Sequence, residues 1–222
     1  MRSIIVSFAV AAFTLALPTL ASAQVLVVGG ATSVALDFDA LRDNASLDTP
    51  SVSAGIGSGV LPGSFAFPIN SRTAASLPTT FEYTAGNFPS GPFAGTIEHT
   101  GSVFFNNETV EVGNFTIGFD AGRADAVNSG FFVSSTTGIA APLFDIAVTE
   151  IGPQTASALE VEGDLRVTPT FAQFLLDNSL ATADLTGVDV GDARIVATAI
   201  PEPTAIAFAL SAATFAVTRR RR

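Results

Sequence analysis

Leu159-Glu160-Val161-Glu162-Gly163-Asp164-Leu165-Arg166-Val167 is the stretch that decides the fold of this 222-residue chain. Apolar residues and one glycine alternate with charged residues along its whole length. A period of two residues is typical of a β-strand with one face buried and the other in water. The same period recurs at residues 34–39 and 115–120, so we expect an all-β fold.

Shorter apolar segments elsewhere in the chain are separated by turn-forming residues such as Asn106-Asn107, Gly152-Pro153 and Gly191-Asp192. Many short strands at such spacing predict an antiparallel β-sandwich of the jelly-roll kind over residues 24–199. A closed barrel or a β-solenoid is less favoured, because no repeat of fixed period is present. The further strands are expected at residues 25–28, 65–69, 80–83, 95–99, 102–105, 109–112, 130–134, 145–151 and 193–198.

One segment of the middle region has a helical pattern. Thr168 is a suitable N-cap, Pro169 suits the first helical position, and Phe171 with Leu175 begins an apolar stripe. Asn178 is placed to end the helix. We expect one short helix that closes an end of the sandwich, with an apolar docking element as the alternative.

The N-terminus has the features of a secretory signal peptide. Arg2 precedes an apolar stretch at residues 4–17, and Ala21 and Ala23 form a small-residue cleavage site. Cleavage after Ala23 leaves Gln24 as the first residue of the mature protein. Residues 1–23 are therefore expected to form a signal helix that is no part of the fold.

The C-terminus, residues 200–222, has three consecutive parts. Pro201-Glu202-Pro203 is followed by an uncharged apolar run at residues 204–218 and then by Arg219, Arg220, Arg221 and Arg222. As a helix the run spans roughly 22 Å, less than the roughly 30 Å of a bilayer core, so it predicts a marginal membrane anchor. The arginines are expected to stay on the cytoplasmic side, which leaves the domain outside. The two prolines keep the motif extended.

This tail resembles the PEP-CTERM sorting signal of bacteria, which an exosortase recognises and cuts. The resemblance implies sorting and processing at Pro201, Glu202 and Pro203, with an exosortase-type enzyme as partner and a transient membrane anchor. The middle region also resembles uncharacterised PEP-CTERM proteins, through residues 113–120, Leu143-Phe144-Asp145 and Gly191-Asp192-Ala193-Arg194. That second resemblance implies no activity. A plain C-terminal anchor with a chance Pro-Glu-Pro is the alternative.

Charge and cysteine content restrict the partners and the compartment. Between the two terminal segments, five arginines stand against 19 acidic residues, a net charge of −14, and the chain has no lysine. Such a surface repels nucleic acid, and it avoids anionic polysaccharide unless divalent ions bridge the two. The chain also has no cysteine, so disulfides and thiolate metal sites are excluded.

Catalytic patterns are scarce in this sequence. His99 is the only histidine, and no Gly-x-Ser-x-Gly elbow between a strand and a helix accompanies it. The parity of its strand places His99 with Ile97 and Val103, which favours a packed histidine over a catalytic one. A zinc site is disfavoured, because carboxylates suit zinc poorly. The many carboxylates select no acid-base pair, so we expect no enzyme.

Calcium is the one metal that the acidic composition suits, as an alternative to solvated acidic loops. Neither candidate group has the spacing of an EF-hand loop. The first candidate group is Asp37 with Asp39 and Asp43, and it is expected on the solvent face of a strand. The second is Asp184 with Asp189 and Asp192, and it lies near two glycines whose carbonyls can add ligands.

We interpret the chain as an exported, non-catalytic protein of the bacterial cell surface or extracellular matrix, structural or adhesive in type. A carbohydrate-binding module is the first alternative, with extracellular polysaccharide as partner. It requires a groove that carries Tyr83 or exposed phenylalanines, because the mature domain has no tryptophan. A secreted hydrolase is the third reading, and it requires His99 or a carboxylate pair in a polar cleft.

Overall fold

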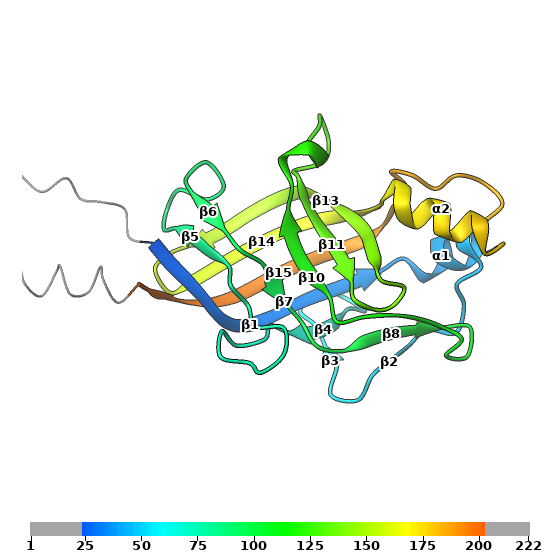
Figure 1. Ribbon diagram of the computed structural model, residues 1–222, viewed down its shortest axis with the longest axis horizontal. Coiled ribbons are helices and arrows are strands. Elements are labelled where there is room, and N and C mark those ends of the chain that lie inside the picture. Colours follow the sequence, from blue (N-terminus) through cyan, green and yellow to red (C-terminus); the bar gives the residue numbers. More distant parts are fainter. Residues whose placement is uncertain (1–23, 203–222) are drawn as a thin grey trace, which may run out of the picture.

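The computed structural model describes residues 24–202, and these residues form a mostly antiparallel β-structure with two short α-helices (Figure 1). The expectation of an all-β fold is confirmed. Two sheets are present, one of 11 strands and one of four. The long strands are β1 (Gln24–Leu36), β13 (Ala141–Gln154), β14 (Ala158–Val167) and β15 (Asp189–Pro201).

The remaining elements are short. The helical ones are α1 (Phe38–Ala45), α2 (Pro169–Asp177) and the 3-10 turn η1 (Ala121–Arg123). The strands are β2 (Ser51–Val52), β3 (Gly57–Ser58), β4 (Phe65–Pro68), β5 (Glu82–Thr84), β6 (Phe93–Ala94), β7 (Ile97–Glu98), β8 (Ser102–Phe105), β9 (Val110–Gly113), β10 (Thr116–Phe119), β11 (Phe131–Ser135) and β12 (Thr137–Gly138).

The large sheet is curled until its edges meet. Its main order is β3-β4-β1-β15-β14-β13-β11-β10-β7, and the small sheet runs β12-β9-β8-β2. Just past β4 and β7, Ile69 and His99 form an antiparallel bridge, and the Asn70 amide donates to the Glu98 carbonyl over 2.7 Å. We call this junction the seam. One large curled sheet and one small sheet are thus present, in place of the two comparable facing sheets of the predicted jelly-roll sandwich.

The alternating strand that led to the fold prediction is confirmed as β14. Its residues alternate between buried and half-buried along the whole strand, from Ala158 to Val167. Leu159, Val161 and Leu165 join the core, while Glu160 and Glu162 point outward to Arg194. Burying one face and solvating the other is how an antiparallel sheet covers a core.

Helix α2 begins and ends as the sequence predicts. The Thr168 hydroxyl accepts from the Phe171 amide over 3.1 Å, Pro169 opens the helix, and Asn178 caps its end. Phe171 and Leu175 are buried. Figure 1 shows α2 and α1 together at one end of the molecule, which agrees with the expected closure of that end.

Helix α1 corrects the prediction of a strand through residues 34–39. Strand β1 stops at Leu36, and Asp37 becomes an N-cap whose side chain accepts from the Ala40 amide over 2.9 Å. Leu41 and Ala45 are buried on the helix face that follows. The alternating pattern does not form a strand beyond Leu36, because a capping carboxylate and an apolar residue four positions later favour a helix.

Two predicted turns were wrong, because they lie within strands. Gly152-Pro153 is part of β13, where the pairing shifts between Ile151 and Gln154, and Gly191-Asp192 is part of β15. At Gly191 the φ is +142°, and a Cβ there would lie 2.1 Å from the Ala35 carbonyl oxygen. Glycine is therefore needed for the close approach of β15 to β1.

The domain begins and ends at the same pole, opposite the two helices (Figure 1). Val25 at the start of β1 pairs with Pro201 at the end of β15, and the strands remain neighbours along their length. Between Gln24 and Glu202, no helix is long and apolar enough to cross a membrane.

Candidate functional site

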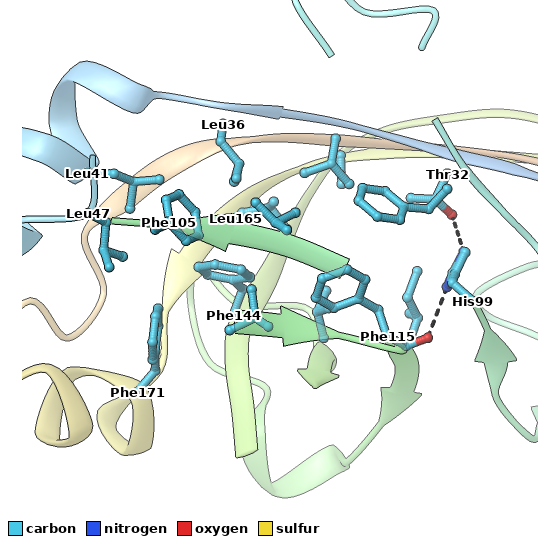
Figure 2. Close-up of a pocket in the computed structure, with 17 residues that line it drawn as sticks. Thr32, Leu36, Leu41, Leu47, His99, Phe105, Phe115, Phe144, Leu165 and Phe171 are labelled. Carbon is cyan, nitrogen blue, oxygen red and sulfur yellow. Dashed lines mark hydrogen bonds between the residues drawn. The ribbon is translucent and has the colours of Figure 1, made fainter. Parts of the chain in front are cut away.

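His99 lies at the seam, where the two edges of the large sheet meet. Its side chain points inward and is 1% exposed. The ring Nδ1 lies 3.1 Å from the Phe115 carbonyl oxygen, and Nε2 lies 2.8 Å from the Thr32 hydroxyl oxygen (Figure 2). A single histidine thus joins the chain before β10 to strand β1 through the interior.

The partners of His99 determine its tautomer. A carbonyl oxygen can only accept, so Nδ1 carries the hydrogen and donates to Phe115. Nε2 is then an acceptor, and the Thr32 hydroxyl donates to it. Burial lowers the pKa of His99 from 6.5 to about 4, and the hydrogen bond to Phe115 opposes this shift only in part. The ring is neutral and its two nitrogens are satisfied.

A small cavity lies beside this pair (Figure 2). Its volume is about 50 Å³, and apart from Thr32 and His99 its lining is apolar, with Phe67, Phe144 and Leu165 among the walls. An engineered apolar cavity that takes up benzene has roughly 150 Å³. A water needs two or more polar partners, and both polar side chains here already bond each other. The cavity therefore has the character of a packing gap.

The sequence predicts that His99 is packed in the interior, and this prediction is confirmed. Ile97, Val103 and His99 are all buried, so the parity argument placed the ring on the correct face. Thr32 was not foreseen as its partner, since it lies 67 residues away in the sequence. No local pattern connects the two positions. Acid-base exchange with a dissolved substrate requires contact with solvent, and this ring has almost none.

Some carboxylates of the described region pair with arginines. Asp145 accepts from Arg123 Nε over 2.7 Å, and the guanidinium lies 5.0 Å from the centre of the Phe132 ring. Arg194 bridges Glu160 and Glu162 at 3.0 and 3.4 Å. The first pair joins η1 to β13, and the Arg194 pairs join the neighbouring strands β15 and β14 on the outer face of the sheet.

The calcium candidates do not assemble into a site. Among residues 24–202, no group of three or more acidic or histidine side chains is arranged to hold a metal ion. Asp184 accepts from the Thr186 amide and hydroxyl at 2.9 and 2.7 Å, and these bonds lower its pKa. Asp189 accepts from Gly191. Local turns thus engage these two carboxylates separately.

Asp192, the third member of that group, lies on strand β15 opposite Asp164. Its pKa is raised, first by burial and then by the charges of Asp164 and Asp189. The other candidate group is dispersed by helix α1. Asp37 caps that helix, while Asp39 and Asp43 both pair with Arg42.

Tyr83 is unavailable as a sugar-stacking platform. Its side chain is 0% exposed, and its hydroxyl donates to the carbonyls of Thr155 and Ala158 over 2.6 and 3.0 Å. Burial raises its pKa to about 12. Around it, five phenylalanines form a continuous cluster in which only Phe119 is substantially exposed, at 41%. The cluster comprises Phe81, Phe88, Phe93, Phe119 and Phe131.

The beginning of the predicted sorting motif lies at the terminal pole. Pro201 is the last residue of β15, and the Glu202 amide donates to the Gln24 carbonyl over 3.0 Å. Both residues are half-buried. The structure thus brings the predicted first mature residue beside the predicted processing motif, a proximity that no sequence pattern indicates. Pro203, residues 204–218, Arg219 to Arg222, Ala21 and Ala23 lie outside the described residues.

No protein-family model and no curated protein matches this chain. Among solved structures, the C-terminal domain of HtaA from Corynebacterium glutamicum is similar to it, with a TM-score of 0.49 and 15% sequence identity. The match covers 79% of this chain and 99% of that domain.

Proposed function

We propose that this chain is the precursor of an exported, non-catalytic protein of the bacterial cell surface or extracellular matrix. An exosortase-type enzyme processes it at Pro201, Glu202 and Pro203. The observation that carries the proposal is the shared pole: Val25 and Pro201 are paired, so both terminal segments depart from one end of the domain. The domain itself serves a structural or adhesive purpose.

The shared pole fits a protein that is attached to one membrane at both ends before processing. A signal peptide precedes Gln24, and the apolar run of the tail follows Glu202, in the interpretation given above. Because β1 and β15 are antiparallel neighbours, the segments enter and leave the domain at adjacent positions. Neither segment has to pass along the domain to reach the membrane. Two cuts at this pole then release it.

The interior supports a structural reading over a catalytic one. The two described interior cavities have volumes of about 50 and 20 Å³, and their linings are almost wholly apolar. His99 is neutral and bonded on both nitrogens. A hydrolase needs titratable groups within reach of a bound substrate. Glu160 and Glu162 are instead paired with Arg194 on the outer face, and the buried Glu98 accepts from the Thr116 hydroxyl over 2.6 Å.

The acidic surface suits a protein that works outside the cell. The net charge of −14 over the mature region keeps the domain soluble and away from nucleic acid. Extracellular polysaccharide remains the proposed partner class. An anionic polysaccharide requires divalent ions as bridges, whereas a neutral one contacts the polar outer face directly.

The test is the intact mass of the protein from its native host, fractionated into membrane, matrix and medium. We expect a species that starts at Gln24 and ends near Pro201. Glu202→Ala should accumulate as an uncut precursor in the membrane fraction, whereas the matched variant Glu108→Ala, in an exposed loop, should be processed normally. An unchanged mature mass for Glu202→Ala, or a wild-type species that retains Arg219 to Arg222, would contradict the proposal.

A further inference from the structure

The sorting motif continues the last strand of the fold. Leu26 pairs with Ile200 and Val25 with Pro201, and the Glu202 amide donates to the Gln24 carbonyl over 3.0 Å. Strand β14, on the other side of β15, has its last paired position at Ala158 and Thr198. Ile200 and Pro201 thus continue to pair with β1 beyond the last position at which β14 pairs with β15.

The parity of the strand explains why proline is tolerated there. In an antiparallel strand, successive amides point alternately to the two neighbours. The Ala199 amide donates away from β1, to Ser157, and the Glu202 amide donates toward β1. Pro201 has the parity of Ala199, so its missing amide hydrogen would have pointed away from β1. No bond of the β1 ladder is lost at Pro201.

The two prolines leave the motif with a single backbone donor. Pro201 and Pro203 have no amide hydrogen, so only Glu202 can donate from the backbone. That hydrogen is engaged by the Gln24 carbonyl. An enzyme that binds an extended peptide by strand pairing relies on such main-chain hydrogen bonds. The only backbone donor of this motif is therefore already bonded to β1.

We propose that β1 restrains the sorting motif, so that Pro201 and Glu202 must leave Gln24 and Val25 before the exosortase-type enzyme can cut. This regulation rests on the proposed function. The rate of processing is then set by how readily the terminal pair opens. Cleavage after Ala23 converts this end of β1 into a chain terminus, and chain termini open more easily than continuous strands. Signal-peptide removal therefore precedes and promotes tail processing.

A reversible cross-link tests the restraint. Leu26→Cys with Ile200→Cys places two cysteines at paired positions, where antiparallel Cα atoms are about 5.5 Å apart, a separation that suits a disulfide. The chain has no other cysteine, so no other intramolecular disulfide can form. Each single variant is the matched control. In the native host, conversion of precursor to mature protein is followed by intact mass, with and without a membrane-permeant reductant.

We expect the disulfide-linked variant to be processed at least ten-fold more slowly than either single variant, with the rate restored by the reductant. Equal rates with the disulfide present would overturn the restraint while leaving the sorting proposal intact. If wild type itself is never cut, the proposed function fails and the restraint with it. Normal thermal unfolding of the purified double variant shows that a slow rate does not arise from misfolding.

A second variant changes the rate in the opposite direction. Once the signal peptide has been cut after Ala23, deletion of Gln24 leaves the Glu202 amide without this acceptor, and we expect processing to become roughly two- to ten-fold faster, as for loss of one exposed backbone hydrogen bond. Gln24→Ala is the matched control, because it retains the backbone carbonyl and should be processed at the wild-type rate. A deletion variant that is no faster than this control would contradict the restraint.

Discussion

At the seam, β1 meets His99 through a buried side-chain hydrogen bond, whereas at the terminal pole the same strand meets Glu202 through a half-exposed backbone bond. Thr32 and His99 are enclosed by apolar walls, and both are less than 5% exposed. Ile200, one residue before the motif, is 47% exposed. One strand thus contributes both to the buried core and to the terminal pair that we propose must open for processing.

The difference teaches where substitutions should affect stability and where they should affect processing. In the core, a lost contact leaves a void or an unpaired polar atom that water cannot reach, so the cost is large. At Ile200, which is 47% exposed, water replaces what is lost, so the cost in stability is small.

The largest effect is expected from enlarging the cavity. Leu165→Ala removes a buried side chain from its wall and should lower the free energy of unfolding by about 2–5 kcal/mol. Ile200→Ala, at the exposed pole, should lower it by less than about 1 kcal/mol. Urea unfolding of the mature protein measures both. Similar losses for the two variants would show that the pole is as tightly packed as the core.

The next effect is a dependence on pH that comes from His99. Its folded pKa of about 4 lies below the usual 6.5, so between these values the unfolded chain binds a proton that the folded protein does not. Stability should therefore fall as pH decreases from 6.5 to 4, by about 3 kcal/mol in total, with no further loss from this group below pH 4.

His99→Gln isolates this contribution, because glutamine does not titrate and the chain has no second histidine. Urea unfolding at several pH values should give a steeper fall for wild type than for the variant between pH 6.5 and 4. Whatever the variant loses in stability at neutral pH, the two slopes can be compared. Parallel curves would contradict a buried neutral histidine.

The smallest of the three effects is expected from removing one hydroxyl. Thr32→Val keeps the shape of the side chain but leaves His99 Nε2 without a donor, at a cost of about 1–3 kcal/mol. Thr32→Ser retains the donor and should lose less. Thr198→Val, at an exposed position of β15, should change stability by no more than about 0.5 kcal/mol. Thermal or urea unfolding measures these losses of stability. Equal losses for Thr32→Val and Thr198→Val would contradict the prediction.

The sequence predicted the local elements well where one signal was unopposed. The alternation around Leu165 marked β14, and the Thr168 cap with Pro169 marked α2 to within a residue. It failed at residues 37–39, where a short alternation competed with the capping side chain of Asp37. It failed again at Gly152 and Gly191, because a glycine inside a strand gives the same local signal as a glycine in a turn.

For the candidate sites too, the sequence predicted local features and missed contacts between distant residues. The packed character of His99 followed from parity, but its partner Thr32 did not, and the three acids near Gly187 did not converge. The motif at Pro201 was visible in the sequence, whereas the hydrogen bond from the Glu202 amide to the Gln24 carbonyl was not. Each missed relation joins residues far apart in the chain.

By itself, the sequence of this protein determined the strand-rich class, helix α2, the acidic charge and the pattern of its two terminal segments. These properties depend on residues within a few positions of one another, where periodicity and capping act directly. Only the tertiary structure decided that the sheet curls into a seam at His99 and that Gln24 lies against Glu202. Such contacts depend on strand order and register, which arise from burying the whole core at once.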